Sequence, residues 1–381
     1  MRQNTCYMLT EIAGVPYLLP VGQMIADQRR GIRINGTGAY LWTLLAQDRT
    51  VEDLTKLCAA HYHAAEESLP QLKADIEEFV SDLTDRGILL SSRPRQVSEE
   101  EPCKYIRIAG LTCALYGPAE AFSAEWDAFV REPAQTPDQT IRILLKTPKF
   151  HENGMTLIRS EEFIVMERPD KYILLFPSST RIAEAHLTKD GSECVFYCIP
   201  PAAHPLSEEL FHAIRPAFLY LAGIHHMAAL HSASILYREK AWLFSASSGT
   251  GKSTHVNLWH SLLGTPILNG DLNLLALQDG RAVIHGIPWC GSSGISDTHT
   301  YPLGGIFLLR QAPDDRVETL SEDRRRLLVL QRLISPSWDA KLYERNLRLV
   351  DTLAADILIC RLYCTPQLTA MEAAKEAIDS Y

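Results

Sequence analysis

The chain has 381 residues, 46% of them hydrophobic and 22% charged, a composition that indicates a folded globular protein of two or three domains. Its net charge of −9 and its scattered Lys and Arg residues argue against a nucleic-acid surface. No apolar run approaches the roughly 20 residues needed to cross a bilayer, and MRQNTC does not lead into a signal-peptide core. We therefore expect a cytoplasmic protein with neither a nucleic-acid nor a membrane partner.

Residues 1–92 have the pattern of a small helical domain with a few strands. The runs YLLPVG and GIRING predict strands, NGTGAYLWTLL predicts a first helix, and the capping-box pattern at Thr50 starts a second helix. Apolar residues at helical spacing predict a third helix, which Gly87 would end. Residues 93–102, within the polar run SSRPRQVSEEEP, have the composition of a linker.

This first domain resembles the PqqD-like family, the peptide-recognition domains found beside enzymes that modify ribosomally made peptides. The resemblance rests on INGTGAYLWTLL, RTVEDLTKLCAAHY and LTDRGIL, in that order. It implies a winged-helix-like fold on which the leader segment of a precursor peptide binds as an added strand, beside the last helix. The partner expected for residues 1–92 is therefore a precursor peptide. The pattern alone leaves open a generic winged-helix unit.

Residues 103–225 alternate apolar and polar positions in short runs such as YIRIAGLTCALYG, IRILLKT and CVFYCIP. Such runs, separated by turn residues, predict an antiparallel β-rich region, which a helix from Leu206 to about Leu221 follows. The region carries no recognisable chemistry. We expect it to serve as a scaffold for the last domain, residues 226–381.

The run FSASSGTGKST, from Phe244 to Thr254, has the features of a phosphate-binding loop. It follows the apolar run KAWLFSA and precedes KSTHVNLWHSLL, a predicted helix with Val256, Trp259 and Leu262/Leu263 inward. Backbone N–H groups at the helix start attract an anion, and two glycines let the backbone approach it. Ala246 replaces the first glycine of the usual pattern, and the rest is intact. The expected nucleotide-binding residues are Ser247, Ser248, Gly249, Thr250, Gly251, Lys252, Ser253 and Thr254.

The last domain resembles the HPr kinase/phosphorylase family, including its branch of peptide and serine kinases. The resemblance rests on LHSASI, GKSTHVNLWHSLLG, ILNGD, HGIPWCGSSG and PLGGIFLLRQAP, in that order. It implies an α/β phosphate-loop domain, so that the whole chain is α/β, or α+β overall. It also puts His231, which precedes Lys252 by 252 − 231 = 21 positions, in the catalytic site, and Trp289 and Cys290 in the wall of that site.

The chain departs from that family at one position. The family usually has two adjacent aspartates after the loop helix, the first to polarise the attacking hydroxyl and the second to bind metal, whereas this sequence has Gly270 and Asp271. The resemblance implies that Asp271 and Ser253 hold Mg²⁺, that Lys252 contacts the β- and γ-phosphates, and that Lys252, Asp271 and His231 are catalytic. His231 would accept the hydroxyl proton or contact phosphate. A turn aspartate and a structural histidine stay open as alternatives.

The expected function is that of a kinase which uses ATP or GTP with Mg²⁺ to phosphorylate a Ser or Thr of a ribosomally made, post-translationally modified peptide. Residues 1–92 would hold the leader and raise the concentration of the peptide at the kinase to the millimolar range for a short link. One alternative is a non-catalytic escort that binds nucleotide and peptide. Another is a small-molecule serine kinase. The sequence leaves open whether the chain forms a homo-oligomer.

Overall fold

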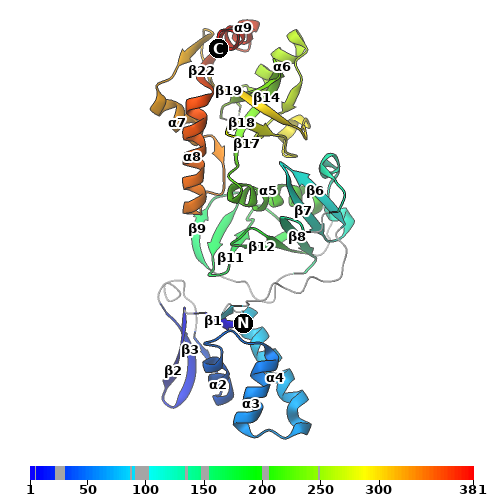
Figure 1. Ribbon diagram of the computed structural model, residues 1–381, viewed down its shortest axis with the longest axis vertical. Coiled ribbons are helices and arrows are strands. Elements are labelled where there is room, and N and C mark those ends of the chain that lie inside the picture. The colour runs from blue at the N-terminus through cyan, green and yellow to red at the C-terminus, as the bar shows by residue number, and fades with distance from the viewer. Residues whose placement is uncertain are drawn as a thin grey trace. The chain divides into compact units, whose positions relative to one another are not determined.

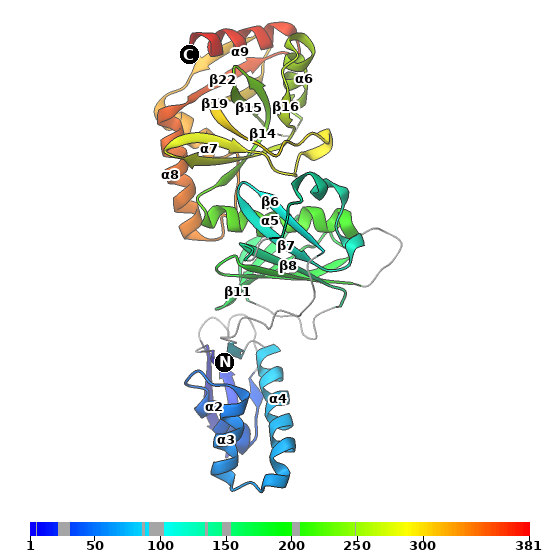
Figure 2. The same ribbon diagram turned by 45° about the vertical axis from the view of Figure 1, so that its right-hand side comes forward.

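The computed structural model describes residues 1–4, 6–21, 31–85, 88–90, 103–133, 136–146, 154–199, 206–247 and 249–381. Its contacts divide the chain into two units. The first comprises Met1–Glu101, Leu144–Lys189 and Phe196–Pro200, and the second comprises Pro102–Ile143, Asp190–Val195 and Pro201–Tyr381. Helices and strands occur in both units, so the fold is mixed α/β (Figures 1 and 2). None of the described helices is long and apolar enough to cross a membrane.

The described residues of the N-terminal part of the first unit combine a small antiparallel sheet with the helices α2, α3 and α4 (Figure 1). The sheet has the order β2-β3-β4, and β1 pairs with β5. The elements are β1 (Arg2–Gln3), β2 (Tyr7–Ile12), β3 (Val15–Pro20), β4 (Ile32–Arg33), α2 (Gly36–Leu44), α3 (Val51–Tyr62), α4 (Leu69–Asp85) and β5 (Leu89–Leu90).

Local capping explains where the first two of these helices begin. The Asn35 side chain accepts a hydrogen bond from the Gly38 N–H at 2.7 Å at the start of α2. At α3, Asp53 N–H donates to Thr50 Oγ1 at 3.1 Å and Thr50 N–H donates to Asp53 Oδ2 at 3.0 Å, a complete capping box. Both predicted helix starts are confirmed. Gly87 and residues 93–102, where the sequence predicts a helix end and a linker, lie outside the described residues.

The β-rich region after the N-terminal part contains antiparallel pairs and, among the strand pairs described here, one parallel pair. In the first unit, β9 (Met155–Arg159), β10 (Ile164–Glu167), β11 (Lys171–Leu175) and β12 (Ile182–Thr188) are antiparallel neighbours. In the second unit, β6 (Lys104–Ile108) and β7 (Leu111–Tyr116) form a hairpin, but β7 pairs in parallel with β8 (Gln139–Leu144). The connection between β7 and β8 contains two 3₁₀ turns, which gives it the length that a parallel crossover needs. Strand β13 (Glu193–Cys198) and helix α5 (Leu206–Ile224) follow.

The rest of the second unit is built on a nine-stranded mixed sheet. Strand β15 pairs in parallel with β19, and β19 pairs in parallel with β22, so the carboxyl ends of these three strands lie at one edge of the sheet. That edge is where open α/β sheets bind ligands. The strands are β14 (Ala228–Tyr237), β15 (Lys240–Ser245), β16 (Ile267–Asn269), β17 (Leu272–Gln278), β18 (Arg281–His285), β19 (Thr300–Gln311), β20 (Arg316–Thr319), β21 (Leu333–Ile334) and β22 (Leu358–Cys364).

Two pairs of helices cover this sheet. One core cluster joins residues of α6 (Lys252–Leu263) and α9 (Leu368–Ser380) to β15 and β22, and another joins α7 (Glu322–Leu330) and α8 (Ala340–Asp356) to the sheet (Figure 2). Val256 and Trp259 of α6 are buried in the first cluster, as the sequence predicts. The prediction that Leu262 and Leu263 point inward is wrong, because both lie in the last turn of α6, beyond the core cluster, and are 48% and 43% exposed.

Replacing Thr50 by Ala should weaken the start of α3, because the change removes the acceptor of the capping box. We expect a loss of about 1 kcal/mol, or roughly fivefold faster amide exchange in the first turn of α3. Hydrogen exchange of the full chain, followed by mass spectrometry, measures this. Thr50→Ser keeps the acceptor and is the matched control. Equal exchange in the Ala and Ser variants would contradict the role of the cap.

Candidate active site

The loop between β15 and α6 requires glycine at two positions. Gly249 has φ 75° and Gly251 has φ 110°, both in the left-handed region that side chains with a Cβ rarely adopt. No atom lies within 4 Å of a Cβ built at either residue, so the backbone conformation, and not crowding, selects glycine. Gly251 is the N-cap of α6 and has no side chain over the first N–H groups of the helix. These groups are therefore open to an anion. Ser248 lies outside the described residues.

Ala246 does not obstruct this loop, although it stands where the first glycine of the motif is usual. The residue is 0% exposed, and its methyl group belongs to the core cluster that contains Phe244 and Val256. The side chain is thus part of the packing beneath the loop. The departure from glycine at this position is compatible with a phosphate cradle.

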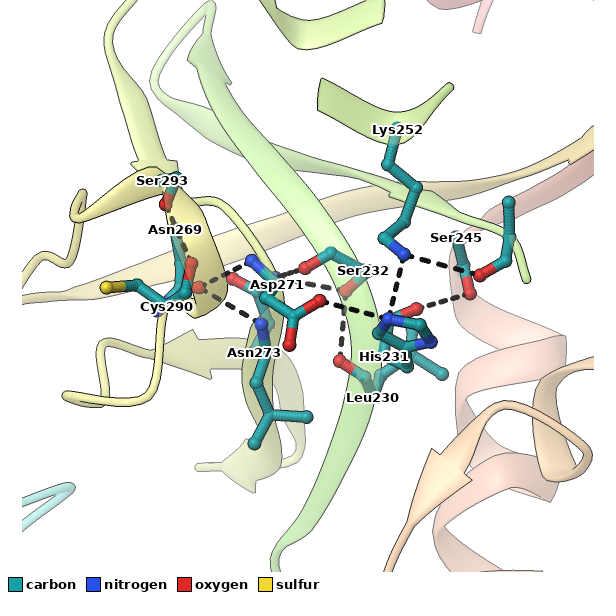
Figure 3. Close-up of polar contacts among 12 residues, drawn as sticks. Leu230, His231, Ser232, Ser245, Lys252, Asn269, Asp271, Asn273, Cys290 and Ser293 are labelled. Carbon is teal, nitrogen blue, oxygen red and sulfur yellow. Dashed lines mark hydrogen bonds and ion pairs between the residues drawn. The ribbon is translucent and has the colours of Figure 1, made fainter. Parts of the chain in front are cut away.

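Three of the residues that the sequence singles out meet beside the loop (Figure 3). Lys252 Nζ lies 2.8 Å from His231 Nε2, and His231 Nε2 also lies 3.0 Å from Asp271 Oδ1. Lys252 comes from the first turn of α6, His231 from β14, and Asp271 from the residue before β17. Lys252 is 8% exposed, whereas the side chains of His231 and Asp271 are 24% and 34% exposed. The cluster therefore opens to solvent on the Asp271 side.

One nitrogen of His231 cannot satisfy both neighbours at once. A protonated Nε2 donates to the Asp271 carboxylate, and an unprotonated Nε2 accepts from the Lys252 ammonium. The hydrogen bond from His231 is the main cause that lowers the pKa of Asp271, so this carboxyl group is ionised at neutral pH. The pKa of Lys252 is lowered, mainly by burial and also by the positive charge of Arg332. The negative charge of Asp271 raises this pKa but does not cancel the effect of burial. A phosphate that attracts Lys252 would leave His231 paired with Asp271.

Residues that the sequence analysis missed hold this cluster in place. Ser245 Oγ donates to the His231 carbonyl at 2.7 Å, and the His231 N–H donates to the Arg332 carbonyl at 3.0 Å. The Arg332 guanidinium donates to Ser247 Oγ in the loop at 3.1 Å. Arg332 follows α7 and lies 80 positions after Lys252, 332 − 252 = 80, in no motif. Only the fold brings it to the loop.

A turn of the chain fills the space beside Gly270. A Cβ built on Gly270 would lie 2.1 Å from Ser293 Oγ and 2.4 Å from Ser293 Cβ. Ser293 belongs to the 3₁₀ turn Gly291–Ser293, and its hydroxyl donates to the Cys290 carbonyl at 2.7 Å. Gly270 itself is not in the left-handed region. Glycine is therefore required at 270 because another segment of the chain occupies the space that a side chain would take.

Trp289 anchors the segment that leads to this turn. Its indole N–H donates to the Phe211 carbonyl of α5 at 2.8 Å, and its side chain is 2% exposed. The ring also packs edge-on against Trp126, with centroids 5.7 Å apart. Trp289 thus points into the core and supports the wall of the site from behind. Burial raises the pKa of the neighbouring Cys290 thiol, which makes it a poor nucleophile at neutral pH.

The oxygen atoms of Asp271 and Ser253 near the loop could hold Mg²⁺ together with the phosphates of a nucleotide. Mg²⁺ is usually held by one or two carboxylates, substrate phosphates and several waters. Asp271 contacts His231 through Oδ1, and its second oxygen has no contact that competes with a metal among those described. Ser253 is exposed in the first turn of α6. Among the residues that the structure describes, no group of three or more His, Cys, Asp or Glu side chains forms a metal site. A Mg²⁺ ion here would depend on the phosphates of a ligand.

A pocket of about 380 Å³ adjoins the loop on the side of α6 and α9. Its lining includes Thr254 and Leu258 of α6, Gln311 at the end of β19, and Thr365 and Pro366 after β22. Burial lowers the pKa of His255, which also lines the pocket, to about 4, so its imidazole is neutral at pH 7. No residue that is described as lining this pocket carries a charge at neutral pH. Its chemistry suits a neutral, flat ligand group.

Comparison with known proteins adds one assignment. Residues 22–89 match the family model described as coenzyme PQQ synthesis protein D (PqqD). The PqqD match includes α2, α3 and α4, and it confirms the expected PqqD-like domain in this part of the chain. None of the curated proteins compared with the chain matches it.

The comparison with solved structures finds a weak likeness. The structure of the Hpr(Ser) kinase/phosphatase from Coxiella burnetii has 11% sequence identity and a TM-score of 0.19, and the match covers 32% of this chain and 87% of that one. At this TM-score, the likeness carries no argument about activity.

Replacing Gly270 by Ala should destabilise the second unit, because the new Cβ forces the Ser293 turn to move. We expect a loss of about 1–3 kcal/mol, as for other overpacked sites. Ser293→Gly removes the two nearest atoms that the new Cβ would meet and leaves the Cys290 carbonyl oxygen, at 3.1 Å, as the next, so the double variant should recover most of the loss. Thermal unfolding of the four proteins gives the coupling. Losses that simply add would show that Ser293 does not restrict position 270.

Proposed function

We propose that this chain is a nucleotide-dependent kinase that phosphorylates a hydroxyl group of a ribosomally made peptide. The observation that carries the proposal is the meeting of Lys252, His231 and Asp271 at 2.8 and 3.0 Å beside a loop with the backbone of a phosphate cradle. The PqqD match at residues 22–89 supports a peptide as the partner. A peptide bound there by strand addition would be tethered to the chain that carries the loop, which raises its effective concentration.

The groups around the loop suit both the phosphates and the nucleoside of a nucleotide. The N–H groups at the start of α6 and the Lys252 ammonium suit the phosphates. The neutral pocket lined by Thr254, Leu258 and Pro366 suits the nucleoside, because an apolar wall with a few hydroxyl and amide groups can hold a base and a ribose. ATP and GTP are both compatible with this lining. Mg²⁺ held by Asp271 and Ser253 would neutralise charge on the transferred group.

The transfer step then follows from the cluster. The acceptor hydroxyl oxygen bonds to the γ-phosphorus, the bond from that phosphorus to the bridging oxygen breaks, and the nucleoside diphosphate leaves. With Lys252 engaged by phosphate, the His231 tautomer that carries its proton on Nδ1 presents the Nε2 lone pair to the hydroxyl proton, and Nε2 donates to Asp271 only after it has taken that proton. The Asp271 carboxylate, 3.0 Å from that nitrogen, stabilises the imidazolium that results. His231 would in this way replace the aspartate that is missing at position 270.

One observation favours a second candidate, the non-catalytic escort. The turn at Ser293 occupies the space in which a side chain at position 270 would lie, so the site lacks the first aspartate that the resemblance to the HPr kinase/phosphorylase family implies. An escort would bind nucleotide and peptide without moving phosphate. The two candidates differ in a single measurable event.

Mass spectrometry of a precursor peptide encoded beside this gene, after incubation with the protein and Mg-ATP or Mg-GTP, tests the kinase. We expect a phosphorylated Ser or Thr with the native chain and none with Lys252→Ala, which removes the charge nearest the phosphates. Calorimetry should show at least tenfold weaker nucleotide binding by that variant. Lys240→Ala, an exposed change on β15, is the control. Tight nucleotide binding with no phosphopeptide would favour the escort.

The leader should affect substrate capture more than the chemical step. We expect a peptide without its leader to have a KM at least tenfold higher than the full precursor and a similar kcat, because only tethering is lost. Steady-state rates with both peptides measure this, and leader peptide added separately should inhibit the full precursor. Equal KM values for the two peptides, together with rapid phosphorylation of free serine, would favour the small-molecule kinase.

A further inference from the structure

A second pocket, of about 390 Å³, adjoins the phosphate loop and differs in chemistry from the neutral one. Three arginines line it: Arg310 near the end of β19, Arg332 after α7, and Arg361 in β22. Ser247 and Thr250 of the loop also line it. No carboxylate belongs to the described lining, so three arginines from separate elements line one pocket at the carboxyl edge of the sheet without an acidic residue among them.

The positive charge of this pocket is only partly compensated. Arg361 is 8% exposed, and its Nη1 donates to Glu318 Oε2 over 3.4 Å, a long contact for a charged pair. The same Glu318 oxygen accepts from Tyr363 Oη at 3.2 Å, and its other oxygen lies 4.0 Å from the guanidinium of Arg324. One carboxylate is therefore shared among several donors.

The other two arginines have no acidic partner within ion-pair distance in the described part of the chain. Arg332 donates to the neutral Ser247 hydroxyl at 3.1 Å, and the guanidinium of Arg310 lies 6.0 Å from the centre of the Tyr363 ring. Guanidinium forks match the oxygens of phosphate in geometry, so the two groups are available to an anion in the pocket.

We propose that this pocket is a second anion site, which binds a phosphate-class anion separately from the phosphate loop. Its occupant is a free phosphate or pyrophosphate, or a phosphate group carried by the bound nucleotide. The site requires neither an acceptor peptide nor a transfer step, so it goes beyond the function proposed above. Because Ser247 and Thr250 line the pocket as well, an anion there would contact the outer side of the loop while Lys252 holds the inner side.

Equilibrium dialysis of the full chain against radiolabelled inorganic phosphate tests the site. We expect two anions per native chain and one per Lys252→Ala chain. Arg361→Met and Arg310→Gln should bind the pocket anion at least tenfold more weakly and keep the one at the loop. Arg310 is exposed, so its variant keeps the test valid if Arg361→Met does not fold. Arg316→Gln, which removes an exposed arginine paired with Asp314 outside the pocket, is the matched control.

Repeating the dialysis with saturating ADP identifies the source of the anion. Phosphate that stays bound to the pocket shows that a free anion is the ligand, and phosphate displaced from the pocket as well as from the loop shows that the nucleotide supplies the group. A single anion in the native chain that Lys252→Ala removes, or full binding by Arg310→Gln, would overturn the proposal. If the phosphate loop does not bind phosphate but the pocket does, the native chain will bind one anion. Lys252→Ala will still bind this anion, and Arg310→Gln will not.

Discussion

The candidate site depends on the register of one strand, β14. This strand pairs with β15 and β16 along its later part and with β17 and β21 along its first part, so its position fixes the loop, His231 and Asp271 together. A slip of one residue would turn the His231 side chain to the other face of the sheet. The pairing of His231 with Leu272 is what places it beside Asp271.

Buried hydrogen bonds make that register specific. Ser234 Oγ donates to Asn273 Oδ1 at 2.7 Å. Asn273 Nδ2 donates to the Ser232 carbonyl at 2.6 Å, and Figure 3 shows these two residues side by side. Asn269 N–H donates to Ser234 Oγ at 3.2 Å. These four residues are at most 1% exposed, so any other register would bury their polar groups without partners. Apolar packing alone would tolerate a shift that these bonds do not.

The sequence predicts those parts of the molecule that local rules determine. The capping box at Thr50 and the buried side of α6 through Trp259 follow from short patterns, and the structure agrees with both. Helical spacing does not show where the core beneath α6 ends, so it predicts Leu262 and Leu263 to be buried although both are exposed. Arg332 reaches the loop only through the fold, from outside any motif.

The turn at Ser293 has a consequence for how this chain can change over time. Since Ser293 fills the space beside Gly270, the two positions are no longer independent of each other. An aspartate at 270 is therefore not reached by a single tolerated substitution, because the turn must be altered as well. Such a dependence between two positions is epistasis, and it restricts the order in which substitutions at 270 and 293 can be accepted.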